Sequence, residues 1–346
     1  MRELTVAHAT HACRVVVDTG FDGLADALDT ALPRPTARAV LVTDTHVGPH
    51  HAEAVVSAAG RPVDVVTLPV GEARKTIDTW RDLVDRLLSI GIDRSVPVLA
   101  LGGGVITDLA GFAAATVLRG VPLVNLPTSL LGMVDASIGG KTGVNHDRGK
   151  NLVGAFHPAH LVWMATDTLA TLPDVERRAG LGEVVKTAAV GDADLLDDVT
   201  TASVTDIVER CARVKGRIVE ADERESGARM LLNAGHTLGH AYETALGHGT
   251  LPHGFAVGLG LVAEARYAVE EGLCEDTAFP ERLASTLATL GLPTERPAMN
   301  FDVFEAALRA DKKRAGDLLR VPLPERPGVY RVRALDPDAV ERLAHS

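Results

Sequence analysis

Aromatic side chains are scarce in this sequence of 346 residues, because Phe, Trp and Tyr together make up only 3%. The core must therefore be built from Ala, Val and Leu. Cysteine is also rare: Cys13, Cys211 and Cys274 lie far apart, and no CxxC pair occurs. This pattern argues against a disulfide framework and favours reduced thiols, as in a cytoplasmic protein.

Long apolar runs and basic clusters are missing as well. No stretch of about 18 apolar residues is free of charge, so we expect no membrane span, and the N-terminus lacks the apolar segment of a secretory signal. No run of five Lys or Arg occurs, and the formal net charge is -11. Such a chain repels nucleic acid and anionic membranes, so an anionic ligand requires a local cluster of cations.

The length fits two domains of ordinary size, and 46% hydrophobic with 23% charged residues is typical of a soluble globular protein. In the first part, short β-branched runs alternate with helical stretches such as 77–88. This alternation predicts a Rossmann-like parallel sheet with helices on its faces. The predicted strands are 14–17, 39–43, 63–68 and 96–101.

After about residue 150 the segments become long, periodic and rich in Ala, Glu and Arg, which indicates helices. These lie at 174–189, 204–223, 228–246, 254–271, 279–290 and 302–313. The sequence therefore predicts an α/β domain over 1–155, followed by a mostly α-helical domain over 156–346.

Three glycines at 102–104 follow a predicted strand and precede Asp108 and an Ala-rich helix. Glycines at such a turn let backbone N–H groups approach a phosphate, and the helix N-terminus adds partial positive charge. A role in the turn alone is an equally good interpretation. Asp44, at a strand end, has two interpretations as well: an acceptor for a ribose hydroxyl, or an N-cap of the next helix.

The segment from Asp135 to Asn145 places an acid, a lysine, an asparagine and three glycines in eleven residues, and Lys150 and Asn151 follow. Glycines expose the backbone, and lysines supply compact charge for phosphate. This density favours a binding site over an ordinary solvated loop. The segment is not a P-loop, because GxxxxGK[ST] is absent.

Histidines cluster near residue 240, beside Arg224, Arg229 and Asn233. A single histidine is usually a core or surface residue, but four within 18 residues favour a site. His236 and His240 share one helical face, so spacing alone favours them as a metal-ligand pair. The others are His248 and His253, and Glu183 is an acid with apolar neighbours. The candidate cations are Arg119, Lys141, Lys150, Lys186, Lys215, Arg229 and the Lys312–Lys313 pair.

Seven motifs occur in the order found in 3-dehydroquinate synthases, which are sugar phosphate cyclases, and the chain resembles that family over roughly residues 70–315. The motifs are GGGVITDLAGFAAATVLRG, LPTSLLGMVDASIGGKTGVN, GKNLVGAFHP, AGLGEVVK, DERESGARMLLNAGHTLGHAYE, HGFAVGLG and DKK. The resemblance implies NAD at the N-terminal sheet and a divalent metal in the helical domain, Zn²⁺ or alternatively Co²⁺.

Residue by residue, the resemblance implies Glu183, His236 and His253 as metal ligands, and His240 facing the substrate instead. Arg119 would come from the partner subunit of a homodimer, and Lys313 is preferred over Lys312 in the DKK motif. The other substrate-site residues implied are Asp135, Lys141, Asn151, Lys186, Lys215, Arg229 and Asn233. NAD would contact Asp44, Glu72, Lys75, Gly103, Gly104, Val105, Asp108, Thr128, Ser129 and Lys150.

The implied substrate is a phosphorylated sugar acid, 3-deoxy-arabino-heptulosonate 7-phosphate. The implied reaction begins with hydride transfer to NAD⁺ and continues with β-elimination of phosphate, return of the hydride and an intramolecular aldol closure to 3-dehydroquinate. Two positions depart from the family pattern: Phe255 replaces the usual Glu after the metal histidine, and Ala234 replaces a larger residue. Phe255 bears on which sugar phosphate is used.

Three alternatives remain at this point. A sibling cyclase would act on an amino-sugar analogue, glucose 6-phosphate or sedoheptulose 7-phosphate. A metal-dependent alcohol or glycerol dehydrogenase would produce net NADH, whereas a cyclase produces none. A non-catalytic binding module would have little need for both lysine clusters and the histidines.

Overall fold

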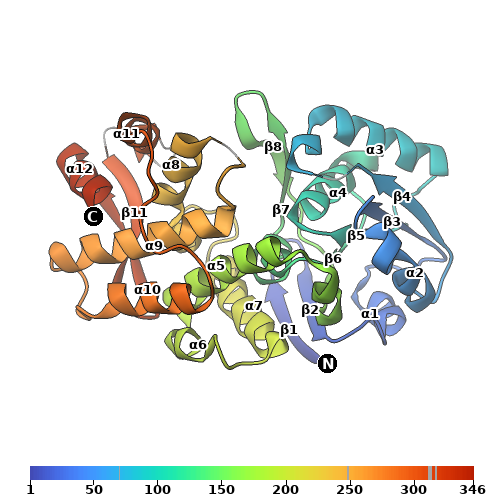
Figure 1. The fold of residues 1–346 in the computed structure, drawn as a ribbon. Helices are drawn as coiled ribbons and strands as arrows, with labels where there is room; N and C mark the ends of the chain where they lie inside the picture. Colours follow the sequence, from blue (N-terminus) through green and yellow to red (C-terminus); the bar gives the residue numbers. More distant parts are fainter. Residues whose placement is uncertain (70, 248, 311–313, 316–317) are drawn as a thin grey trace. The chain divides into compact units, whose positions relative to one another are not determined.

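The computed structural model describes residues 1–69, 71–247, 249–310, 314–315 and 318–346. The chain forms two compact units, Met1–Leu172 and Pro173–Ser346 (Figure 1). Composition suggests a boundary at 155/156, but the first unit continues through strand β9 (Leu161–Ala165). The reason is that β9 pairs with β2 (Ala12–Asp18) and β6 (Leu123–Pro127) inside the first unit's sheet.

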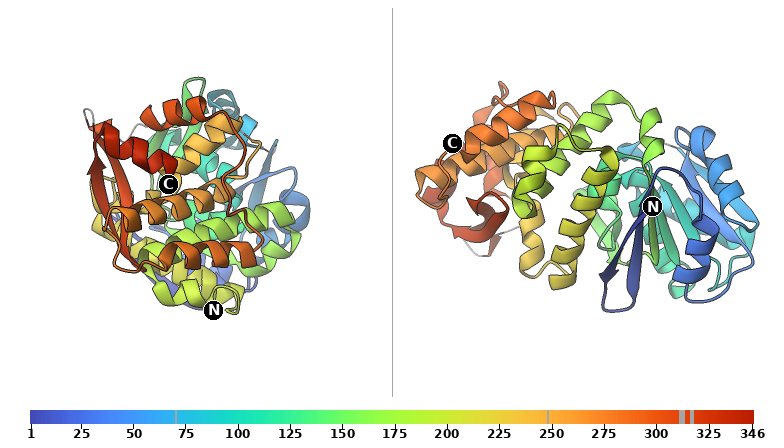
Figure 2. Two further views of the ribbon diagram at one scale, coloured as in Figure 1. Left: turned by 60° about the vertical axis from the view of Figure 1, so that its left-hand side comes forward. Right: turned by 90° about the horizontal axis from the view of Figure 1, so that it is seen from below.

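The first unit is built on a seven-stranded sheet in the order β1-β2-β9-β6-β5-β3-β4. Only the β1–β2 pair is antiparallel, and this hairpin lies at one edge of the sheet (Figure 2). The four central strands, β9, β6, β5 and β3, are buried along their whole length, as their apolar runs require. The remaining strands are β1 (Arg2–Ala7), β3 (Ala39–Asp44), β4 (Val63–Leu68) and β5 (Val98–Gly102). The predicted fold class, a largely parallel sheet with helices, is confirmed.

Four helices accompany the sheet, and the last of them carries the glycine motif at its start. Helix α4 contacts β5 and β6 and also a separate antiparallel ribbon of β7 (Lys141–His146) and β8 (Gly149–Phe156). A Cβ on Gly111 of α4 would lie 2.5 Å from the Thr142 methyl, so the ribbon packs directly on this helix. The helices are α1 (Leu24–Ala31), α2 (Gly48–Ala58), α3 (Ile77–Ile90) and α4 (Gly104–Thr116).

The second unit is mostly helical, as the sequence predicts. An antiparallel sheet of β10 (Arg314–Ala315), β11 (Leu318–Arg326) and β12 (Val329–Leu335), which the sequence did not indicate, completes it. No helix among the described residues is both long and apolar enough to cross a membrane. The helices are α5 (Asp174–Gly191), α6 (Ala193–Asp198), α7 (Val204–Ala221), α8 (His236–Leu246), α9 (His253–Glu270), α10 (Phe279–Thr289), α11 (Phe301–Arg309) and α12 (Pro337–His345).

Two of the predicted helices differ from the structure. The helix expected over 228–246 is interrupted, because Gly235 has a φ of 76° and turns the chain between the 3₁₀ helix η5 (Ala228–Asn233) and α8. The helix expected over 302–313 ends at Arg309, and positions 311–313 lie outside the described residues.

The backbone of helix α9 lies in direct contact with the backbone of α5 and of the segment before α8, because glycines occupy the contact points. A Cβ on Gly182 of α5 would lie 2.1 Å from the Gly254 carbonyl oxygen, and a Cβ on Gly254 would lie 1.8 Å from the Ala179 oxygen. Six residues further along α9, a Cβ on Gly260 would lie 2.0 Å from the Gly235 oxygen. Any side chain larger than hydrogen would push these segments apart.

This contact predicts that Gly254→Ala destabilises the second unit, while Gly258→Ala on the same helix does not. At Gly258 the nearest atom to an added Cβ is the flexible Leu287 side chain, 3.2 Å away. We expect a loss of about 3 kcal/mol for Gly254→Ala, as for an overpacked core. For Gly258→Ala, better helix propensity of about 1 kcal/mol offsets any strain. Urea unfolding of both variants tests this, and equal unfolding free energies would contradict it.

Candidate metal centre and its surroundings

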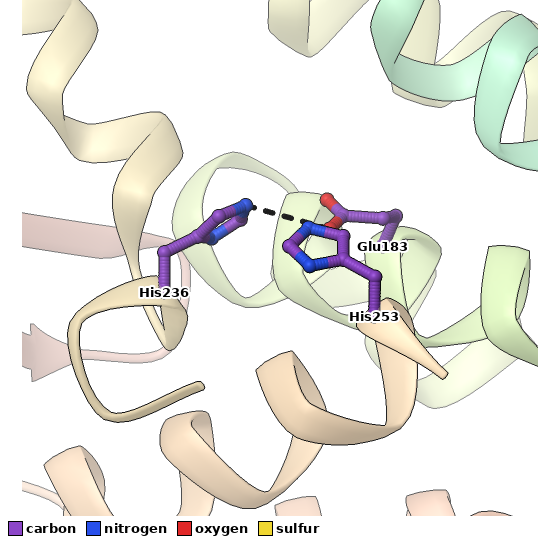
Figure 3. A group of neighbouring side chains, drawn as sticks. All are labelled: Glu183, His236 and His253. Carbon is purple, nitrogen blue, oxygen red and sulfur yellow. Dashed lines mark ion pairs between the residues drawn. The ribbon is translucent and has the colours of Figure 1, made fainter. Parts of the chain in front are cut away.

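Three side chains that commonly bind metals meet in the second unit, each from a different helix (Figure 3). Glu183 lies in the middle of α5, while His236 and His253 are the first residues of α8 and α9. One ligand-type atom from each lies within 4.8 Å of the others. Gly182, Gly235 and Gly254 directly adjoin these residues, so the close backbone contacts also bring the three side chains together.

The two imidazoles present the same nitrogen to the carboxylate. His236 Nε2 and His253 Nε2 lie 3.6 Å and 3.4 Å from Glu183 Oε1. The other ring nitrogen of each histidine faces an acceptor. His236 Nδ1 lies 3.1 Å from the Ala234 carbonyl oxygen, and His253 Nδ1 lies 3.4 Å from Glu243 Oε2. When both imidazoles are neutral, as metal binding requires, a proton on each Nδ1 satisfies these acceptors and leaves both Nε2 lone pairs directed at Glu183.

The Glu183 carboxylate is buried in a way that fits a cation. Its side chain is 1% exposed, and both of its oxygens are buried. The Lys186 ammonium lies 2.9 Å from Oε2 and is fully buried. Burying a carboxylate is costly unless positive charge compensates it. One carboxylate and two neutral imidazoles are also the donor set of an open catalytic zinc site.

The pKa values follow from burial and from these charges. Burial opposes ionisation of Glu183, but Lys186 and the imidazoles outweigh it and hold the carboxyl pKa well below its usual range. Burial lowers the pKa of His236 to about 3, which keeps that imidazole neutral. Burial also opposes charge on His253, but the carboxylates of Glu183 and Glu243 raise its pKa to about 10. Without a metal, a proton on His253 therefore compensates the two carboxylates.

His240 adjoins this group without joining it. Its ring centroid lies 5.5 Å from that of His236 and 5.8 Å from that of His253, and the residue is exposed. Among the described residues, no three-residue group of ligand type contains both His236 and His240. The pair favoured by spacing alone is therefore not brought together on one cation, because the ligands gather from three helices instead of one.

The loop before η5 is organised around Asp222. Its Oδ2 accepts hydrogen bonds from the backbone N–H groups of Gly227 and Arg229, at 2.6 Å and 3.0 Å. Its Oδ1 accepts the backbone N–H and the hydroxyl of Ser226. The Asn233 amide donates to Glu225 Oε1 at 2.8 Å. This network fixes two of the predicted substrate residues, Arg229 and Asn233.

Buried cations are concentrated in this unit. Lys186, Lys215 and Arg229 are 0%, 5% and 2% exposed. Buried cations require anionic or strongly dipolar partners, so their density suits an anionic ligand. The predicted residue Lys313, its neighbour Lys312 and the candidate His248 lie outside the described residues.

In the first unit, Lys75 connects several of the predicted residues. Its ammonium, 4% exposed, lies 2.5 Å from Asp108 Oδ2 and 2.6 Å from Asn151 Oδ1. Asn145 joins the same network, because its amide donates to Glu72 Oε1 at 2.7 Å and its Oδ1 accepts the Asn151 N–H at 3.0 Å. The structure therefore gathers Glu72, Lys75, Asp108 and Asn151 where η1 (Glu72–Arg74) meets the β7–β8 ribbon.

The glycine turn is crowded on its inner side. Gly103 precedes α4, and a Cβ on it would lie 3.3 Å from the Ser129 hydroxyl; on Gly104, a Cβ would lie 3.4 Å from Ala136. Val105 lies in the first turn of α4, and the Thr128 N–H donates to the Gly102 oxygen at 3.0 Å.

Asp44 closes the turn before α2. Its Oδ1 accepts hydrogen bonds from the backbone N–H groups of His46 and Val47, so it does not cap that helix directly.

The remaining predicted residues lie on turns and on the ribbon. Arg119 is exposed at φ 65°, next to Leu118 at φ 52°, and Asn151 has φ 55°. Non-glycine residues in the left-handed region are strained, and such strain is enriched at functional sites. Asp135 lies in a single π-helical turn, Lys141 begins β7, and Lys150 is exposed on β8.

Sequence reasoning assigned no role to Glu243 and Glu264, which contact these groups. Glu243 Oε2 lies 3.4 Å from His253 Nδ1, and Glu264 Oε2 accepts the N–H of Gly235, the residue before His236, at 2.6 Å. Glu264 is fully buried within the apolar helix α9, and a lone acid in an apolar run is a usable signal. Glu243, three residues after His240 on one helical face, carried a similar signal.

The fold is that of a two-unit protein, with a largely parallel, Rossmann-like sheet in the first unit and mostly helices in the second. The second unit contains a group of one glutamate and two histidines that is suited to one divalent metal. The family models for the 3-dehydroquinate synthase N-terminal and C-terminal regions match residues 65–179 and 180–314. A 3-dehydroquinate synthase of Synechococcus sp. is 42% identical over 341 residues, covering 93% of this chain and 92% of the relative. The chain belongs to the 3-dehydroquinate synthase family.

Solved structures of related cyclases share the fold. A 2-epi-5-epi-valiolone synthase from Streptomyces hygroscopicus with NAD⁺ and Zn²⁺ bound aligns at a TM-score of 0.83 and 28% identity, covering 99% of this chain and 96% of the other. A 2-deoxy-scyllo-inosose synthase complexed with carbaglucose-6-phosphate, NAD⁺ and Co²⁺ aligns at 0.87 and 24% identity over the full length of both chains. With 24% identity, the similarity to the 2-deoxy-scyllo-inosose synthase shows a shared fold only.

Proposed function

We propose that this protein is a 3-dehydroquinate synthase, which converts 3-deoxy-arabino-heptulosonate 7-phosphate to 3-dehydroquinate and phosphate with catalytic NAD and a divalent metal. The observation that carries the proposal is the convergence of Glu183, His236 and His253 within a chain of this family. A carboxylate and two imidazoles leave coordination positions for a chelating diol, as such a substrate requires.

The metal, Zn²⁺ or alternatively Co²⁺, would polarise a substrate hydroxyl, and NAD would accept and return one hydride. Glu183, His236 and His253 would hold the metal. The first unit would hold NAD, with its glycine turn and the start of α4 directed at the phosphates. The proposed NAD contacts are Asp44, Glu72, Lys75, Gly103, Gly104, Val105, Asp108, Thr128, Ser129 and Lys150.

The cationic side chains would bind the two anionic ends of the substrate. Lys141, Lys215, Arg229 and Arg119 are proposed to neutralise its phosphate and carboxylate. The Asp222 network supports this role for Arg229, because it fixes the backbone from which that side chain projects. The other proposed substrate residues are Asp135, Asn151, Lys186, Asn233, His240 and Lys313.

The first experiment measures phosphate release from 3-deoxy-arabino-heptulosonate 7-phosphate with Zn²⁺ and substoichiometric NAD⁺. We expect equimolar phosphate and 3-dehydroquinate, no net NADH, and loss of activity after EDTA treatment or NAD⁺ removal. An intact, metal-loaded protein that releases no phosphate from this compound would overturn the assignment.

The same assay separates the alternatives. A sibling cyclase would release phosphate from glucose 6-phosphate or sedoheptulose 7-phosphate instead, and Phe255, two residues after His253, would be the first residue to examine. Net NADH production from a simple alcohol would indicate a glycerol-type dehydrogenase. The 42% identity to a 3-dehydroquinate synthase, against 28% to the valiolone synthase, supports the proposed substrate.

His240 is proposed to transfer a proton during turnover, because it is exposed beside the metal group without belonging to it. We predict that His240→Ala keeps stoichiometric zinc and lowers kcat about 100-fold, the usual contribution of a general acid or base. His236→Ala is the matched comparison and should lose the zinc as well. Metal analysis and steady-state kinetics test both, and unchanged turnover in His240→Ala would remove this residue from the mechanism.

Arg119 is proposed to act across the interface of a homodimer in the cytoplasm. We predict that Arg119→Ala and Lys215→Ala are each inactive alone, whereas refolding the two variants together restores activity. In an equal mixture half of the dimers would be mixed, and each mixed dimer would contain one complete site and one defective site. The mixture should therefore reach about a quarter of wild-type activity. A mixture that forms mixed dimers and stays inactive would place Arg119 in its own subunit's site.

A further inference from the structure

A second carboxylate lies behind the metal group. Glu243 is 6% exposed, and its Oε2 lies 3.4 Å from His253 Nδ1, the imidazole nitrogen opposite the one that faces Glu183. The His253 ring therefore lies between two carboxylates. Neither the family resemblance nor spacing assigned a role to Glu243.

The position of Glu243 follows from the two helices. It lies seven residues, or two turns, after His236 on α8, so both side chains project from the same face. That face packs against α9, where a Cβ on Gly239 would lie 3.2 Å from the backbone of Ala256 and Val257. One face of α8 thus supplies one imidazole to the group and a carboxylate behind the other imidazole.

We propose that Glu243 is a positioning residue for the metal ligand His253. It accepts the Nδ1 proton, fixes the tautomer and ring orientation, and makes Nε2 a stronger donor to the metal. His236 has a neutral backbone carbonyl in the equivalent place, so the two imidazoles are not equivalent donors. This inference rests on the metal role proposed above for Glu183, His236 and His253.

His240, Glu243 and His253 also satisfy the spacing of a second cation site. His253 cannot serve both sites as a neutral imidazole. Its Nε2 is directed at Glu183, so binding a second cation through Nδ1 would require loss of the one N–H proton that a neutral imidazole carries. The geometry therefore favours Glu243 as a hydrogen-bond acceptor. Metal stoichiometry distinguishes the two interpretations.

The test compares Glu243→Ala, Glu243→Gln and the exposed α9 control Glu270→Gln, with zinc affinity measured by competition against a chromophoric chelator. We expect one Zn²⁺ per wild-type chain and a 10- to 100-fold weaker affinity in Glu243→Ala, the usual effect of removing such a partner. Glu243→Gln, whose amide oxygen still accepts the Nδ1 proton, should lose less. The control should match wild type, and NAD⁺ affinity should not change in any variant.

Three results would overturn the proposal. Wild-type zinc affinity in Glu243→Ala would show that the contact does not support the ligand. Two zinc ions per wild-type chain, with one lost in Glu243→Ala, would identify Glu243 as a ligand. Equal zinc losses in the Ala and Gln variants, each with a matching drop in apo-protein stability, would show general packing. A wild-type chain that binds no stoichiometric zinc would instead remove the metal centre itself, and with it this inference.

Discussion

The second unit depends on a contact in which helix backbones touch without side chains between them. Gly254 of α9 meets α5 at Ala179 and Gly182, and Gly260 of α9 meets the carbonyl of Gly235 before α8. These contacts place the residues next to the glycines, Glu183, His236 and His253, within reach of one ion. The geometry of the candidate centre is thus a consequence of helix packing.

Charge balance is the second constraint on this centre. Two buried carboxylates, Glu183 and Glu243, flank the His253 imidazole, and the Lys186 ammonium pairs with the first of them. Desolvation penalises each group separately, so the arrangement is stable only when opposite charges lie together. A divalent cation suits this balance, because it can replace the proton that His253 carries in its absence.

The first unit has a comparable constraint, built from hydrogen bonds instead of glycines. Lys75 ties η1 to the β7–β8 ribbon through Asn151, Asn145 of the ribbon donates to Glu72 of η1, and Asn151 itself has a strained backbone. A strained residue persists only where its surroundings hold it, which this network does from two sides. Four of the predicted residues of this unit, Glu72, Lys75, Asp108 and Asn151, therefore lie on one hydrogen-bonded framework.

The sequence by itself determined the parallel sheet, most helices of the second unit and the family, because apolar periodicity and ordered motifs are local properties. It also contained the residues of the centre, but spacing within one helix favoured His236 with His240. The tertiary structure decided otherwise: it joined Glu183 and His253 to His236 from three helices, and placed Glu243 and Glu264 behind them. Contacts between residues so far apart in the chain depend on how helices cross, and no local pattern encodes that crossing except, in retrospect, the glycines that permit it.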